Sequence, residues 1–136
     1  HICDYLQHWI NIGAKADPEK LPKIFYVNWF RKDKDGKWLW PGFGENSRVL
    51  KWVFERVSGE GKAVKTPIGY MPTPDGIDTT GLDVDSSTMQ ELLSVDREDW
   101  LREVASIREF YATFGDKLPK ELANQLDALE KRLREQ

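Results

Sequence analysis

Aromatic side chains are concentrated in one short stretch of the sequence. Seven aromatic residues lie between residues 25 and 43, interleaved with glycines and polar residues. Their flat faces can stack on a planar ligand, and such stacking contributes about 1–3 kcal/mol per nucleobase. Stacking alone does not choose among bases, so a selective site also needs polar groups at the edge of the base. We interpret the stretch as a candidate nucleobase site.

Polar groups of this kind follow the aromatic residues at Phe43-Gly44-Glu45-Asn46. The Asn46 amide carries both a donor and an acceptor. Backbone N–H groups beside the glycines can meet a carbonyl such as guanine O6, because glycine allows a close approach. Asn46 also opens a predicted helix, whose free N–H groups favour an electron-rich ligand atom. The simpler alternatives are that the rings belong to the core and that Asn46 is only an N-cap.

Composition limits the other functional classes. The chain has 136 residues, 40% hydrophobic and 32% charged, which suits one globular domain. A net charge of −3 argues against a nucleic-acid partner. No apolar run approaches the roughly 20 residues of a membrane span, so no membrane partner is expected. The single cysteine, Cys3, fits a reducing compartment, and we expect a cytoplasmic location and a buried thiol.

The hydrophobic pattern predicts an α+β fold. A strand is expected at residues 23–31, and Asp35-Gly36 is expected to turn the chain back as a β-hairpin. Residues 66–70 carry too many turn signals for a strand, and residues 71–85 are expected to form a loop. Helices are expected at residues 4–14, 46–57, 87–95, 96–114 and from 119 onward.

The last two helices are expected to form a C-terminal helical hairpin, with Asp96 as the N-cap of the first. The expected fold is thus a short β-hairpin region packed with several helices. We treat residues 1–136 as a single unit, with a mixed segment at residues 1–85 and a helical tail at residues 86–136.

Catalytic and metal-binding motifs are absent from the sequence. Asp33-Lys34-Asp35-Gly36 resembles the start of a calcium loop but lacks the third acidic position and the closing Glu. His1 and His8 have no partner at metal-ligand spacing. No Gly-x-x-x-x-Gly-Lys-Ser/Thr phosphate loop is present. The sequence therefore predicts no catalytic residue and no metal ligand in this chain, and surface or ion-pair roles for Arg31 and Arg48.

Two longer strings resemble a known family. Residues 23–33, KIFYVNWFRKD, and residues 39–50, LWPGFGENSRVL, look like the C-terminal region of GTP-dependent phosphoenolpyruvate carboxykinases. Residues 4–9 and 66–70 are similar to further segments of that family. The resemblance covers essentially the whole chain and is densest over residues 21–57. Because the sequence enters a helical pattern directly from His1, we expect it to be a fragment of a longer protein.

This resemblance implies a function. Enzymes of the family convert oxaloacetate and GTP to phosphoenolpyruvate, GDP and CO2 in gluconeogenesis. It also implies that this chain contacts the guanine nucleotide, GTP or GDP, through Trp29, Phe30, Trp38, Phe43, Gly44, Glu45 and Asn46. Phe30, Trp38 and Phe43 would line the base pocket, with Trp29 adjacent. Position 38 departs from the pattern, since animal members often have Phe there.

The resemblance also implies what lies elsewhere. In the family, the Mn²⁺ or Mg²⁺ ligands, the phosphate loop and the reactive cysteine precede the region that corresponds to this chain. The remainder of the parent enzyme would therefore be its partner, and the 136 residues alone are expected to be inactive. Two alternatives remain open: a non-catalytic aromatic groove that binds a Pro-rich peptide or a sugar, and a folded remnant with no ligand.

Overall fold

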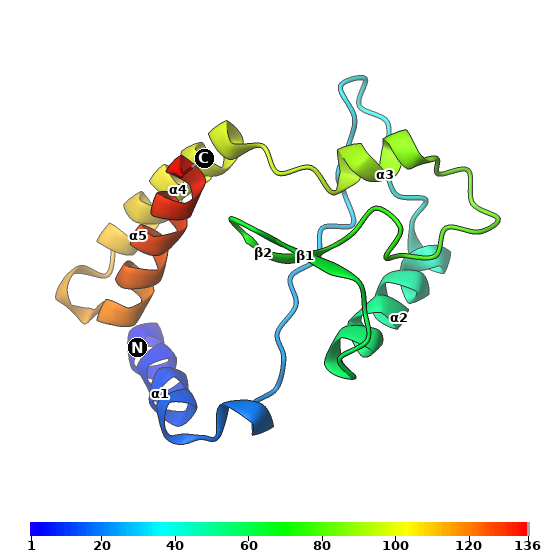
Figure 1. Ribbon diagram of the computed structural model, residues 1–136. Coiled ribbons are helices and arrows are strands. Elements are labelled where there is room, and N and C mark those ends of the chain that lie inside the picture. Colours follow the sequence, from blue (N-terminus) through cyan, green and yellow to red (C-terminus); the bar gives the residue numbers. More distant parts are fainter. Residues whose placement is uncertain (136) are drawn as a thin grey trace. The chain divides into compact units, whose positions relative to one another are not determined.

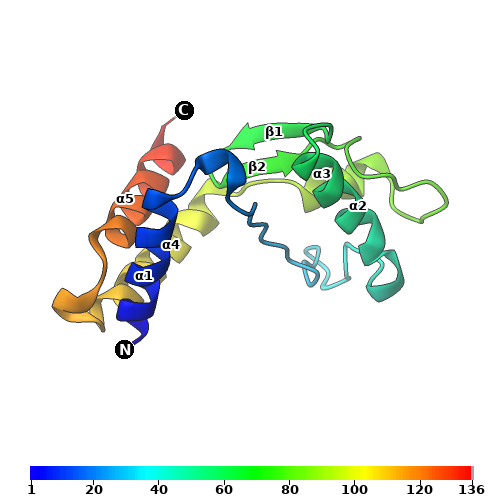
Figure 2. The same cartoon turned by 90° about the horizontal axis from the view of Figure 1, so that it is seen from below.

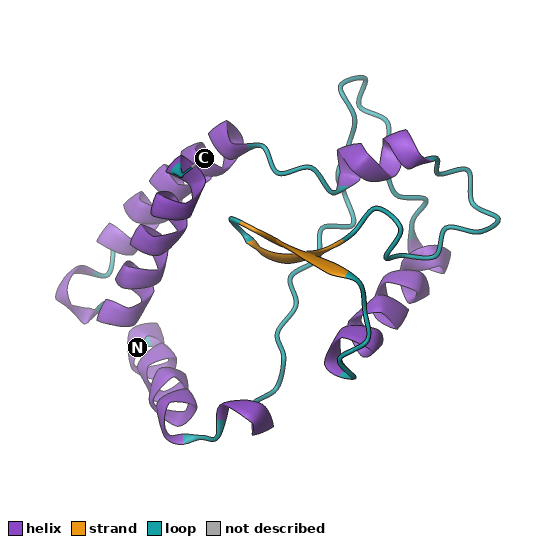
Figure 3. Cartoon of the chain, in the orientation of Figure 1, coloured by secondary structure: helices purple, strands orange, loops and turns teal. Residues whose placement is uncertain are grey.

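The computed structural model describes residues 1–135. In that range, five α-helices and one two-stranded antiparallel sheet are joined by loops and three 3-10 turns (Figure 1, Figure 3). The fold is therefore α+β, as the sequence predicted. Packing divides the chain into two units: Lys23–Ser94, and His1–Pro22 together with the chain from Val95 onward. The division into domains after residue 85 stays a prediction.

A tryptophan-rich core organises the unit Lys23–Ser94. The helix α2, Asn46–Val57, buries Trp52, and the short helix α3, Ser86–Leu92, buries Met89. These side chains pack with Trp40, Ile77 and Val84. The Trp52 indole N–H donates to the Lys62 carbonyl at 2.8 Å, so the buried ring keeps its one polar group satisfied.

The sheet of this unit lies where the sequence predicted no strand. Strand β1, Ala63–Thr66, pairs with β2, Gly69–Pro72, and Thr66 lies opposite Gly69. The prediction that residues 66–70 and 71–72 are irregular is therefore wrong. The Thr66 hydroxyl donates to the Gly69 carbonyl at 2.7 Å, and Gly69 has a φ of 123°, so the turn signals close a tight hairpin.

The strand predicted at residues 23–31 does not form in the described chain. Only an isolated antiparallel bridge joins Lys32 and Trp38, around a turn in which Gly36 has a φ of 78°. The turn at Asp35-Gly36 is confirmed, since the Asp33 N–H donates to the Lys37 carbonyl at 2.9 Å. A β-branched and aromatic run becomes a strand only when a neighbouring strand pairs with it. Within residues 1–135 no strand pairs with residues 23–28.

The second unit is helical. It contains α1, Ile2–Lys15, and two helices that lie side by side, α4, Arg97–Ala112, and α5, Lys120–Arg134 (Figure 2). Arg108 of α4 donates to Asp127 of α5 at 2.9 Å. The predicted antiparallel helical hairpin is confirmed, because Arg97 at the other end of α4 donates to the Leu133 carbonyl at 3.1 Å.

Local capping in this unit also follows the sequence. The Asp96 carboxylate accepts hydrogen bonds at 3.0 Å from the backbone N–H groups of Glu98 and Asp99, as predicted for an N-cap. Cys3 is a free, buried thiol with 1% of its surface exposed. None of the helices in the described part of the chain combines the length and apolar character needed to cross a bilayer.

We expect Met89→Ala to destabilise the unit Lys23–Ser94 by about 2–5 kcal/mol, because Met89 is only 1% exposed and its loss leaves a cavity in the core. Urea unfolding followed by tryptophan fluorescence measures this change. Gln90→Ala is the matched control, since Gln90 is exposed on the same helix. A similar loss in both variants would show that Met89 is not a core residue.

Candidate functional site

Two of the predicted rings form an exposed pair. The bridge between Lys32 and Trp38 brings together the two sides of the turn, and Phe30 meets Trp38 edge-to-face. The ring centroids are 5.9 Å apart, at an interplanar angle of 66°. Phe30 is 70% exposed and Trp38 is 51% exposed. Their aromatic surface is therefore available to a planar ligand.

Trp29 lies in a different environment from this pair. Its ring is partly buried and packs against the core cluster of Trp40, Trp52 and Met89. The Asn28 side-chain oxygen accepts from the Phe30 N–H at 2.9 Å, which fixes a turn at the residues between them. Trp29 and Phe30 are thus neighbours in sequence, but Trp29 is partly buried against the core and Phe30 is exposed.

A short 3-10 turn at Phe43–Glu45 follows the aromatic residues. It begins after Gly42, whose φ of 107° is a conformation that side-chain-bearing residues rarely adopt. The Glu45 N–H donates to the Gly42 carbonyl, and the Asn46 N–H donates to the Phe43 carbonyl. Within residues 1–135, the N–H groups of Phe43 and Gly44 have no hydrogen-bond acceptor. Both can donate to a ligand.

The side-chain environment of this turn is open. The Phe43 ring is 95% exposed and makes no contact with another ring in the described chain. No atom lies within 4 Å of the position that a Cβ would occupy at Gly44, and Gly44 has no positive φ. Packing within the described chain therefore does not require glycine at position 44.

Asn46 is oriented by a core tryptophan. The Trp40 indole N–H donates to Asn46 Oδ1 at 2.9 Å. An indole N–H can only donate, so it selects the amide oxygen and directs the NH₂ group elsewhere. Asn46 is the first residue of α2, whose N-cap is Glu45, so the N-cap alternative for Asn46 is wrong. Within residues 1–135 the Asn46 NH₂ group has no acceptor.

Arg48 ties the turn to a distant loop. Its Nε lies 2.6 Å from Glu45 Oε2, and its Nη1 donates to the Asp78 carbonyl at 2.9 Å. The predicted ion-pair role of Arg48 is confirmed. Hydrogen bonds from the Thr80 side chain and backbone, with a smaller contribution from Arg48, hold the pKa of Asp78 below its ordinary value. The Asp78 carboxylate beside Arg48 therefore stays negatively charged.

A cavity adjoins this region of the unit Lys23–Ser94. Its volume is about 260 Å³, and Trp38 and Glu45 both line it. Residues 81–84 also line it, and they belong to the segment that the sequence predicted as a loop. The helix spacing of Glu45 and Arg48 signals their pairing. No sequence signal indicates that residues 81–84 lie beside Trp38.

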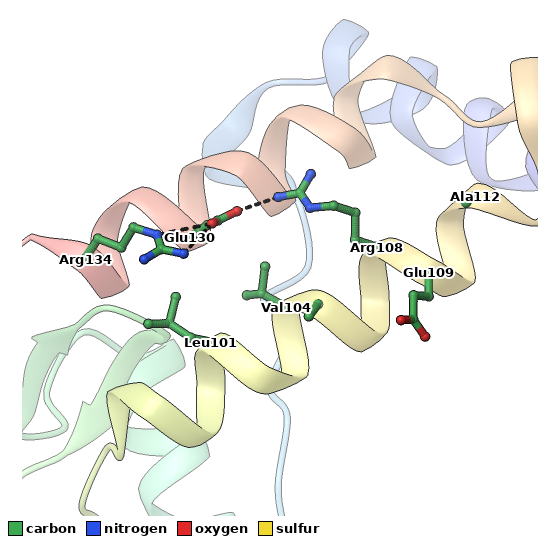
Figure 4. A pocket seen from close by; sticks show the side chains of 8 residues that line it. Leu101, Val104, Arg108, Glu109, Ala112, Glu130 and Arg134 are labelled. Atoms are coloured by element: carbon green, nitrogen blue, oxygen red, sulfur yellow. Dashed lines mark hydrogen bonds and ion pairs between the residues drawn. The ribbon is translucent and has the colours of Figure 1, made fainter.

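A second cavity, of about 410 Å³, lies along α4 and α5 (Figure 4). Its apolar lining includes Leu101 and Val104. Three of its four charged side chains are paired with one another, because Glu130 accepts from both Arg108 and Arg134, and Glu109 is the fourth. No group of three or more His, Cys, Asp or Glu side chains in residues 1–135 could hold a metal ion. The first cavity and the turn beside it are therefore the stronger candidate site.

Comparison with known proteins identifies similar sequences over nearly the whole chain. The family of the phosphoenolpyruvate carboxykinase C-terminal P-loop domain matches residues 1–132. The phosphoenolpyruvate carboxykinase [GTP] of Arthrobacter sp. (strain FB24) is 53% identical over 130 residues, or 96% of this chain and 21% of the relative. The enzymes of the same name from Neocallimastix frontalis and Treponema pallidum (strain Nichols) are 54% and 51% identical, and each is covered over 22% of its length. The chain thus spans about a fifth of these relatives.

We expect Arg48→Met to loosen the turn at Phe43–Glu45, because it removes the charged hydrogen bonds to Glu45 and Asp78. Amide hydrogen exchange at Glu45 and Asn46, measured by NMR, should accelerate about tenfold. Lys51→Met is the matched control, since Lys51 carries the same charge on the same helix but pairs with Glu55. Equal exchange rates in the two variants would contradict a tethering role for Arg48.

Proposed function

The chain belongs to the GTP-dependent phosphoenolpyruvate carboxykinase family, and we propose that its function is to recognise the guanine base of the nucleotide. The observation that carries this proposal is the oriented amide of Asn46. Beside it, within four consecutive residues, are the two N–H groups without an acceptor at Phe43 and Gly44. Aromatic surface for stacking is exposed in the same unit of the chain.

Stacking supplies the non-selective part of the affinity. Phe30, Trp38 and Phe43 are between 51% and 95% exposed, so each has apolar surface that a base can remove from water. Burial of apolar surface contributes about 25 cal/mol per Å², and stacking on an aromatic ring contributes about 1–3 kcal/mol per base. At position 38, where the family resemblance implies Phe in animal members, Trp38 keeps this capacity with a larger ring.

Donors at the edge supply the selectivity. Guanine presents the acceptor O6 where adenine presents an amino group, which donates. The N–H groups of Phe43 and Gly44 and the NH₂ group of Asn46 are all donors, and O6 can accept from up to two groups of this kind. An adenine at the same place would leave the donor that faces its amino group unpaired, at about 1–3 kcal/mol. A guanine preference follows from the donor pattern alone.

In the whole enzyme we propose that base binding positions GTP for transfer of its γ-phosphoryl group. The overall reaction would convert oxaloacetate and GTP to phosphoenolpyruvate, GDP and CO2 in the cytoplasm, as part of gluconeogenesis. Fixing the base at Phe43–Asn46 limits the orientations of the nucleotide and so lowers the entropic part of the barrier. The residues of this chain hold the base and leave the reacting phosphate to other groups.

Those other groups would lie in the remainder of the parent enzyme. Phosphoryl transfer needs Mn²⁺ or Mg²⁺ and cationic side chains around the phosphates. The described residues do not fit such a metal, because they contain no cluster of three suitable ligands. The sequence also lacks a phosphate loop. We therefore assign the metal and the phosphate contacts to the rest of the enzyme, and we expect the 136 residues alone to be inactive.

We expect GDP to quench the tryptophan fluorescence of this chain at concentrations about tenfold lower than ADP, because only guanine accepts from the edge donors. Asn46→Ala should reduce the preference, because it removes the NH₂ donor together with the side-chain oxygen that accepts from the Trp40 indole. Phe43→Ala should lower the affinity for both nucleotides, because it removes an aromatic face on which the base stacks.

Phe54→Ala is the control for Phe43→Ala, since Phe54 is 73% exposed on α2 and lies outside the candidate site. It should bind GDP as the unsubstituted chain does. Equal responses to GDP and ADP would contradict guanine recognition. Quenching by a polyproline peptide or a sugar, but not by GDP, would establish the alternative of a peptide- or sugar-binding groove.

A further inference from the structure

A lysine lies directly on the proposed stacking surface. The Lys32 ammonium nitrogen is 4.3 Å from the centroid of the Trp38 ring, in a cation–π contact. The backbone sets this contact, because Lys32 and Trp38 are the paired residues of the isolated bridge. Phe30 meets the same indole edge-to-face, so Lys32 shares the ring with one of the predicted stacking residues.

No carboxylate of the described residues forms an ion pair with this lysine. The adjacent Asp33 carboxylate instead accepts backbone hydrogen bonds at 2.9 Å from Asp35 and Lys37, which hold the turn. A cation–π contact at an exposed site is weak and uses none of the three ammonium donors for a strong acceptor. The ammonium group therefore remains able to donate to a ligand.

We propose that Lys32 is a specificity-determining residue that donates to the O6–N7 edge of a guanine stacked on Trp38. This inference rests on the proposed guanine-recognition function. It adds a second reading group, that is, a second group that contacts the polar edge of the base. Guanine carries two acceptors, O6 and N7, on this edge, and lysine is one of the side chains that most often reads them. Adenine keeps N7 but places an amino donor beside it, which repels the ammonium group.

The two reading groups come from different segments and address different edges of the base. The turn at Phe43–Asn46 offers donors to O6 and an amide oxygen to the neighbouring N1–H of guanine. Lys32 comes from the Asp35-Gly36 turn region, over Trp38, and the proposal assigns it to the N7 side of the base. Since O6 has two lone pairs, it can accept from one donor of that turn and from Lys32 together. Loss of Lys32 should therefore reduce guanine affinity without removing stacking.

Isothermal titration calorimetry of the 136-residue chain with GDP, ADP and guanosine tests the inference. Lys32→Met keeps the unbranched chain over Trp38 and removes the charge. We expect this substitution to lower the affinity for GDP and guanosine by about five- to tenfold and to leave the affinity for ADP unchanged. Lys32→Arg should largely restore GDP binding, because a guanidinium also donates to O6 and N7. Lys34→Met is the matched control, an exposed lysine of the same turn, and should bind like the unsubstituted chain.

Each other outcome overturns the inference in a distinguishable way. If Lys32→Met lowers the affinity for GDP and ADP equally and leaves the affinity for guanosine unchanged, Lys32 contacts phosphate instead of the base. If Lys32→Met raises the affinity for all three ligands, Lys32 only competes with the base for the indole face. If it changes nothing while the unsubstituted chain binds GDP, the role of Lys32 fails and the proposed function stands. If the unsubstituted chain binds no guanine compound, the proposed function fails as well.

Discussion

The hydrogen bond from the Trp40 indole to the Asn46 side-chain oxygen is the contact on which the candidate site depends. Trp40 is 4% exposed and packs in the core with Trp52 and Met89. A buried indole N–H without an acceptor would cost about 1–3 kcal/mol, so the core itself fixes the orientation of the Asn46 amide. This bond links the packing of the unit to its ability to distinguish donors from acceptors on a ligand.

Two arginines hold the remaining parts of the site in place. Arg48 connects the turn at Phe43–Glu45 to the Asp78 carbonyl. Arg31 donates to the carbonyls of Leu92 and Ser94, each at 2.9 Å, and so anchors the segment that carries Phe30 and Lys32. Backbone carbonyls stay in place when side chains change rotamer, so these contacts restrain the site more firmly than exposed ion pairs would. The backbone segments that carry the rings and the edge donors are thereby restrained before a ligand binds.

Local sequence signals correctly predicted the features that depend on residues close together in the chain. The N-cap at Asp96, the turn at Asp35-Gly36 and the pairing of α4 with α5 are examples. The strand expected at residues 23–31 does not form in the described chain, because pairing requires a second strand and none of residues 1–135 provides it. Within the site, the aromatic stretch was evident from composition. The Trp40–Asn46 bond and the position of the loop at residues 81–84 were not, since both depend on tertiary packing.

Intermolecular nuclear Overhauser effects between GDP and this chain test the central claim most directly. The base should lie against the rings of Phe30, Trp38 and Phe43, with its edge at Asn46. The guanine H8 and ribose H1′ protons should therefore show cross-peaks to protons of these rings, and none to Leu101 or Val104 in the cavity along α4 and α5. Cross-peaks confined to that second cavity, or bound GDP without contact to any of the three rings, would contradict the account.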